Sequence, residues 1–129
     1  MSSKQPVTAP SVKTPANPYS LATRVGNLLF ISGQVALDAE GRLVGKGDIE
    51  AQARQVLANI KALVEAAGGN MDDVVKTTTF VTDMRQFPRT TALRREYFRE
   101  PYPASTAVQV SQLVDPDWLI EIEAIVVLD

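Results

Sequence analysis

The most regular hydrophobic pattern in the chain lies between residues 48 and 69. Apolar side chains recur there at spacings of three and four, which places them on one stripe of an α-helix: Ile49, Ala53, Val56, Ile60, Leu63 and Ala67. Asp48 precedes the stripe and can accept hydrogen bonds from the first free N–H groups of the helix. Gly68 and Gly69 follow it, and glycine commonly ends a helix. The pattern predicts a helix with one buried face.

Five segments are rich in β-branched or alternating residues and predict strands at 19–25, 28–34, 74–82, 104–110 and 119–128. The two-residue link Gly26-Asn27 between the first two segments is typical of a tight hairpin turn. Gly33 marks either a bulge or close approach by another group, or simply the end of its strand.

A second helix is predicted over residues 88–99, with Pro88 in its first turn. Its packing face consists of Leu93, Tyr97 and Phe98. Two helices can cover one face of a sheet of about five strands, so the fold class is α+β.

The last strand indicates what covers each face of the sheet. Alternation places a wholly aliphatic set on one face: Ile120, Ile122, Ala124, Val126 and Leu128. The other face carries Glu121 and Glu123 but also Ile125 and Val127. So much apolar surface on a face without helices predicts burial against further copies of the chain.

A length of 129 residues suits one domain. Prolines at positions 6, 10 and 15 interrupt regular structure, so we expect a flexible arm over residues 1–17 and a single domain over 18–129. No apolar run approaches the roughly 18 residues of a membrane span, and the N-terminus lacks the features of a secretory signal. We therefore expect a soluble, cytoplasmic protein that does not associate with membranes.

The composition restricts the chemistry. The chain has no cysteine and no histidine, which excludes thiolate nucleophiles, histidine-based triads and the commonest metal ligands. Any catalysis must use carboxylates, hydroxyls, backbone groups and water. A net charge of −2 argues against nucleic-acid binding.

A run of arginines is the local exception to this acidic balance: Arg85, Arg89, Arg94, Arg95 and Arg99. Two interpretations are open. The run is either a solvated helix face balanced by Glu96 and Glu100, which we favour, or an anion-binding patch.

Several runs, taken together, resemble the RidA/YjgF family of enamine and imine deaminases. They comprise residues 25–34, Gly47-Asp48-Ile49 with Gln52 and Asn59, residues 73–76 leading to 80–84, Pro103-Ala104, and residues 121–125. The resemblance covers residues 18–128. It implies a chorismate-mutase-like fold and a homotrimer with a central barrel and three ligand clefts at subunit interfaces. The implied reaction is hydrolysis of a reactive enamine or imine to a keto acid and ammonia, without a metal or organic cofactor.

The resemblance also assigns site residues. Tyr19 matches a tyrosine that lines the cleft, Ser32 and Gly33 match its Ser-Gly wall, and Glu121 matches a glutamate that positions or activates water. A carboxylate on an apolar interface would have a raised pKa and could exchange a proton near neutrality. The alternative is that Glu121 forms an ion pair with a lysine or arginine of a neighbouring subunit.

One departure from the family pattern affects substrate binding. Deaminating members carry an arginine after Pro-Ala that binds the substrate carboxylate, whereas this chain has Ser105, followed by Thr106 and Ala107. The family asparagine in the second helix aligns with Thr91. By position, the resemblance therefore assigns substrate binding to Thr91, Ser105, Thr106 and Ala107. A bidentate arginine–carboxylate contact is worth about 1.5 to 3 kcal/mol, so ordinary 2-iminoacids are expected to bind weakly.

Three hypotheses follow from this departure. The cleft hydrolyses an imine or enamine with an altered substrate preference, or it binds a small metabolite without turnover as a regulatory module. In the third hypothesis, an activity reported for some relatives, the protein cuts RNA. The acidic balance and the lack of histidine make RNA cleavage the least favoured of the three.

Overall fold

A computed structural model describes residues 3–129; Met1 and Ser2, the first residues of the expected arm, lie outside the described part. The elements follow one another as β1 (Gln5–Val7), β2 (Ala22–Val25), β3 (Leu28–Gln34), α1 (Ile49–Ala66), β4 (Val74–Val81), α2 (Thr91–Tyr97), β5 (Ala104–Gln109) and β6 (Ile120–Val127). Short 3₁₀ turns, η1 (Met71–Asp73) and η2 (Met84–Thr90), precede β4 and α2.

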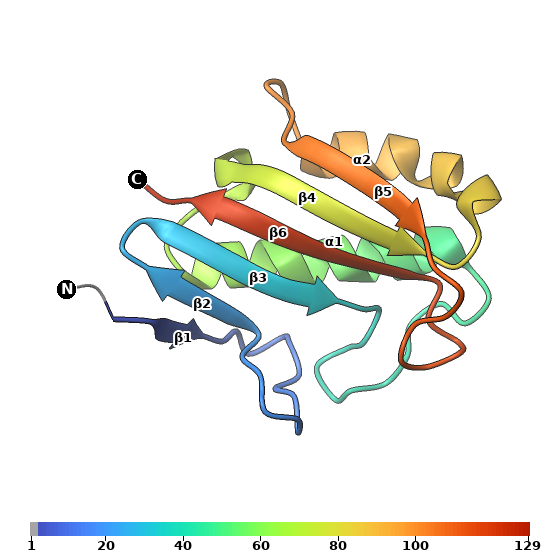
Figure 1. Cartoon of the computed structure of the whole chain (residues 1–129), viewed down its shortest axis with the longest axis horizontal. Helices are drawn as coiled ribbons and strands as arrows, with labels where there is room; N and C mark the ends of the chain where they lie inside the picture. Colours follow the sequence, from blue (N-terminus) through green and yellow to red (C-terminus); the bar gives the residue numbers. More distant parts are fainter. Residues whose placement is uncertain (1–2) are drawn as a thin grey trace.

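All six strands form one mixed sheet in the order β1-β2-β3-β6-β4-β5 (Figure 1). Only β4 and β5 run parallel, and the other neighbouring pairs are antiparallel. The aliphatic alternation of β6 suits its place in the interior of the sheet, between β3 and β4. The mixed α+β architecture predicted from the sequence is confirmed.

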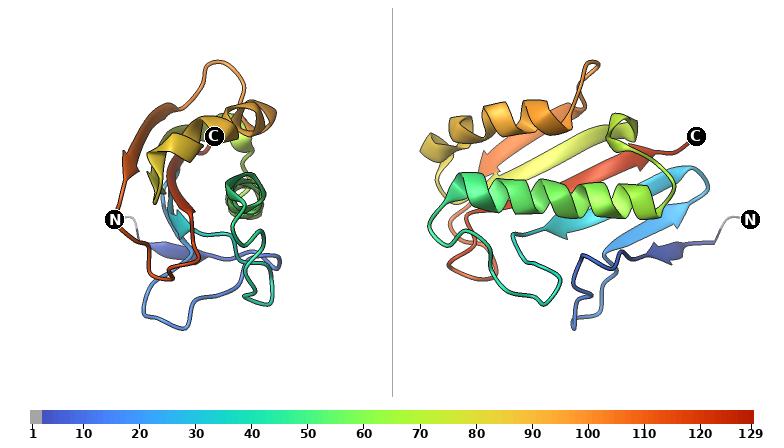
Figure 2. Two further views of the ribbon diagram at one scale, coloured as in Figure 1. Left: turned by 90° about the vertical axis from the view of Figure 1, so that its right-hand side faces the viewer. Right: turned by 180° about the vertical axis from the view of Figure 1, so that it is seen from behind.

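Both helices cover the same face of the sheet (Figure 2). Asp48 caps α1 as predicted, since its carboxylate accepts hydrogen bonds from the N–H groups of Glu50 and Ala51. The apolar stripe of α1 packs on the even-numbered side chains of β6, which are buried. Among the described residues, no helix has both the length and the apolar character needed to cross a membrane.

The predicted hairpin is also confirmed: Val25 pairs with Leu28, and Gly26 turns the chain with φ of 59°. That left-handed conformation disfavours side chains with a Cβ, which explains the glycine.

Two expectations are corrected. The prolines do not keep residues 1–17 free of regular structure, because β1 pairs with β2 around Pro6, on an edge strand where its missing N–H costs nothing. Ala9 and Val12 are buried in the core. The second helix starts at Thr91 rather than at Pro88, and Pro88 lies inside η2.

The second face of the sheet carries no helix, and we call it the open face. Its exposed apolar side chains include Leu28, Phe30, Val108 and Val127. Phe30, which is 42% exposed, pairs in register with Ile125 of β6. The apolar open face expected from the sequence is therefore present.

Candidate functional site

Glu121 projects from β6 onto the open face, where it pairs in register with Phe80 of β4. It is half-buried and has no hydrogen-bonding or ion-pairing partner among residues 3–129. Burial raises the pKa of Glu121, and the nearby Glu123 carboxylate raises it further. An unpartnered carboxyl group of this kind can take up and release a proton closer to neutrality than an ordinary glutamate.

A β-bulge makes room for this carboxyl group. Ile31 pairs with Ala124 and Gln34 with Ile122, so Ser32 and Gly33 together oppose one residue of β6. A Cβ atom on Gly33 would lie 2.7 Å from Cδ and 2.9 Å from Cγ of Glu121, and closer still to Oε2. Of the two interpretations of Gly33, the bulge with close approach is confirmed.

Ser32 fixes the chain segment next to the bulge. Its hydroxyl donates to the carbonyl of Ser20 at 2.6 Å, and its backbone N–H donates to the carbonyl of Leu21 at 2.9 Å. Tyr19 adjoins this segment, is 54% exposed, and lines a small cavity of about 40 Å³ together with Gly33. Ser32 therefore positions the segment that carries Tyr19.

The buried side-chain amides of Gln52 and Asn59, both on α1, hold the loops next to Glu121 and Gly33. Gln52 donates to the carbonyl of Asp117 and accepts from the N–H of Leu119, just before β6. Asn59 donates to the carbonyls of Val35 and Leu37, just after β3. Because these loops enter β6 and leave β3, the amides set the relative positions of Glu121 and Gly33.

Ser105 lies elsewhere, on the helix side of the sheet. It pairs in register with the buried Thr77 and lines a hollow of about 280 Å³. The remaining lining residues come from α2 and the segment before β5: Thr91, Arg94, Arg95, Phe98, Tyr102 and Pro103. Ser105 and Thr91, both predicted from the sequence, thus share one hollow.

Most of the predicted residues fall into two groups, one around the Gly33 bulge and one around the hollow that Ser105 lines. We call Tyr19, Ser32, Gly33 and Glu121 the bulge group, and Ser105 with Thr91 the hollow group. Ala107 is on the helix side like Ser105 but does not line the hollow, whereas Thr106 is on the open face, where its hydroxyl accepts a hydrogen bond from Lys76 at 2.7 Å. Within one protomer, the bulge and hollow groups do not meet.

The sequence did not single out Arg94 and Arg95 as lining the hollow. The solvated-face interpretation holds for three of the five arginines, because Arg85, Arg89 and Arg99 pair with Asp83, Glu50 and Asp72. The spacing along the helix could have identified them. Arg94 and Arg95 follow Thr91 by three and four residues, so they lie on the same side of the helix as Thr91.

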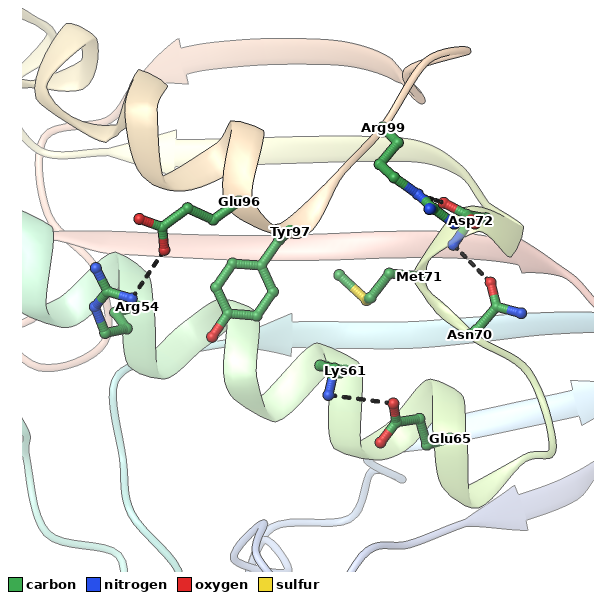
Figure 3. A pocket seen from close by; sticks show the side chains of 9 residues that line it. All are labelled: Arg54, Lys61, Glu65, Asn70, Met71, Asp72, Glu96, Tyr97 and Arg99. Carbon is green, nitrogen blue, oxygen red and sulfur yellow. Dashed lines mark hydrogen bonds and ion pairs between the residues drawn. The ribbon is translucent and has the colours of Figure 1, made fainter.

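A second hollow, of about 500 Å³, is larger than the one that Ser105 lines but is a poorer candidate site. It is lined by α1, η1 and the end of α2, and its ionic side chains are already paired (Figure 3). Arg54 pairs with Glu96 and Lys61 with Glu65, at 3.1 and 3.3 Å, and Arg99 pairs with Asp72. Within residues 3–129, no cluster of three or more acidic side chains could hold a metal ion.

The sequence is similar to known proteins over nearly its whole length. Residues 9–128 match a family model described as endoribonuclease L-PSP. A RutC family protein of Pyrococcus horikoshii is 47% identical over 95% of this chain and 96% of its own. A 2-iminobutanoate/2-iminopropanoate deaminase of Dermatophagoides farinae is 37% identical over all of both chains.

Solved structures of related proteins have the same fold. RidA from an Antarctic Psychrobacter species superposes with a TM-score of 0.89 at 39% identity, covering 96% of this chain and 99% of its own. E. coli TdcF with bound serine gives a TM-score of 0.88 at 32% identity, covering 97% and 99%. A small α+β domain of this architecture is thus a fold that relatives share. The chain belongs to the RidA/YjgF family.

Proposed function

We propose that this protein hydrolyses a small reactive enamine or imine, with Glu121 transferring the protons. The observation that carries the proposal is an unpartnered, half-buried Glu121 beside the Gly33 bulge, with burial raising its pKa. One relative of full length is named as a deaminase of 2-iminobutanoate and 2-iminopropanoate, which is this reaction class.

The chemistry needs only water and a proton carrier. Ionised Glu121 accepts a proton from water as the oxygen attacks the imine carbon, and it then donates this proton to the nitrogen, which gives a carbinolamine. In the second step Glu121 transfers the carbinolamine's hydroxyl proton to the nitrogen; the C=O bond forms, the C–N bond breaks, and ammonia leaves. An enamine is first protonated at carbon, which gives the same imine.

We further propose that the active protein is a homotrimer with its clefts between subunits. The apolar open face supports association, since such surfaces rarely stay in water. The separation of the bulge group from the hollow group also supports it, because one protomer's bulge group can be completed only by another protomer's hollow group.

Ser105 supports an altered substrate preference. It supplies a hydroxyl where deaminating relatives have a guanidinium, so a 2-iminoacid loses one bidentate contact at this position. The substrate is then held by Ser105, Thr91 and Tyr19, either without a carboxylate or with that carboxylate at another place in the cleft.

The same substitution favours a second candidate function, binding of a small metabolite without turnover. E. coli TdcF has been crystallised with serine bound, so the fold accommodates an amino acid that is not an imine. This candidate predicts saturable ligand binding and no product.

A panel of imines and enamines, with and without carboxylates, decides between the two candidates. We expect wild-type protein to accelerate ammonia release from at least one substrate, and Glu121→Gln to reduce the rate by about 10²- to 10⁴-fold, as is typical for loss of a general acid–base. No acceleration over buffer across the panel would reject hydrolysis. An RNA substrate incubated in parallel should stay intact, given the chain's net charge of −2 and lack of histidine.

A further inference from the structure

Arg94 and Arg95 differ from the other arginines of the run between residues 85 and 99. Neither forms an ion pair with any residue from 3 to 129, and both line the hollow that contains Ser105. Three neighbouring arginines are neutralised by carboxylates on the surface. The hollow therefore carries two positive charges without a counter-charge within the described protomer.

Arg94 is held in one orientation. Its Nε and Nη2 donate to the hydroxyls of Thr90 and Thr91, each at 3.1 Å. Its guanidinium lies 4.5 Å from the centroid of the Phe87 ring. Because these contacts use only two of five N–H donors, the group stays available to bind an anion and loses little entropy in doing so.

The surroundings of Arg94 disfavour its charge. Burial lowers the pKa of Arg94, and the positive charge of Arg95 lowers it further, although the guanidinium stays protonated at neutral pH. An anion in the hollow would relieve both effects.

We propose that Arg94, assisted by Arg95, binds the substrate carboxylate in place of the arginine that deaminating relatives carry at the position of Ser105. The inference rests on the proposed function and specifies its substrate class: a small imine or enamine that bears a carboxylate. The anchor has moved from strand β5 to helix α2. The carboxylate therefore lies on the helix side of the hollow, and the small Ser105 side chain leaves room for a bulkier substituent.

The test measures binding of a stable product analogue, so it does not depend on turnover. The probes are 2-oxobutanoate and its uncharged counterpart butanone, titrated by NMR or calorimetry. We expect Arg94→Gln to weaken 2-oxobutanoate binding at least about ten-fold, the effect of losing a charge-assisted pair, and to leave butanone unaffected. Arg85→Gln, which removes a paired surface arginine, is the matched control and should bind like wild type.

Two further variants keep the test decisive if Arg94→Gln folds poorly. Arg95→Gln changes an exposed side chain and should weaken 2-oxobutanoate binding several-fold without loss of stability. Ser105→Arg, added to Arg94→Gln, should restore binding because it returns a guanidinium to the same hollow. The inference is overturned if wild-type protein does not bind 2-oxobutanoate, or if neither arginine variant weakens it selectively. An absence of ammonia release from every imine, with selective binding retained, rejects only the hydrolysis.

Discussion

Glu121 of the bulge group and Ser105 of the hollow group lie on opposite faces of one sheet, and the two groups differ in how tightly they are packed. The bulge group retains each residue that the family resemblance assigns to it. Glu121 fills the space that Gly33 leaves, and the loops on either side are tied to α1 by buried amides. The hollow group has lost the family arginine and asparagine, its Ser105 is exposed, and it has two unpaired arginines instead.

Under the proposed function, this difference would allow a cleft to change its substrate and keep its reaction. Any side chain at position 33 would collide with Glu121, so steric constraint limits which residues can occupy the bulge. A change at Ser105 alters charge and volume in an open hollow and disturbs no packed neighbour. If the two groups come together only between protomers, the hollow can vary without moving Glu121, the proposed proton carrier.

The largest expected effect comes from separating the protomers. Phe30→Glu places a charge on the open face, at a side chain that is already 42% exposed and so contributes little to the core. We expect the proposed trimer to dissociate and ammonia release to fall to the uncatalysed rate, because each proposed cleft would lose one of its two groups. Sedimentation velocity and the ammonia assay, run on the same samples, provide the measurement.

Ala66→Glu is the matched control for Phe30→Glu, because it adds the same charge on the exposed side of α1, away from the open face. It should sediment as wild type and keep full activity. A Phe30→Glu protein that is monomeric and fully active would show that one protomer contains the whole site.

Two glycine substitutions should separate catalysis from stability. Gly33→Ala pushes the Glu121 carboxylate aside, and we expect activity to fall about ten- to hundred-fold, since small misplacements of a reacting group have effects of that size. Gly26→Ala meets no atom within 4 Å but forces alanine into a left-handed conformation. It should cost roughly 1–2 kcal/mol of folding free energy and leave activity per folded molecule unchanged.

Thermal unfolding and ammonia release, measured on both glycine variants, test this contrast. Equal losses of activity in Gly33→Ala and Gly26→Ala would mean that the bulge has no specific role in placing Glu121.

Much of the fold could be predicted from the pattern of apolar, polar and turn residues over short stretches of the sequence. The stripe of α1, the alternation of β6 and the Gly26-Asn27 turn are each determined by residues a few positions apart, and each is confirmed. The N-terminal strand was missed because three residues around Pro6 carry no strand signal of their own. Pairing with β2, which depends on tertiary structure, makes them a strand.

The candidate site was less predictable, because its grouping depends on which face each strand residue occupies. Ser105 and Thr106 are adjacent in sequence and were expected to act together, yet the alternation of β5 places them on opposite faces. Arg94 was grouped with its arginine neighbours by composition. Only the contacts with Thr90, Thr91 and Phe87 distinguish it.

The smallest expected effect tests the electrostatics of the bulge group. Burial is the main cause of the raised pKa of Glu121, and the Glu123 carboxylate is the second. If ionised Glu121 is the base, ammonia release rises with pH through this pKa. Glu123→Gln removes one negative charge, so it should lower the pKa of Glu121 and move the rising limb of the pH–rate profile to lower pH. The plateau rate should not change.

The matched control is Glu65→Gln on α1, which should leave the rising limb of the pH–rate profile in place. A limb that moves to higher pH in Glu123→Gln, or one that persists in Glu121→Gln, would show that another group controls the rate.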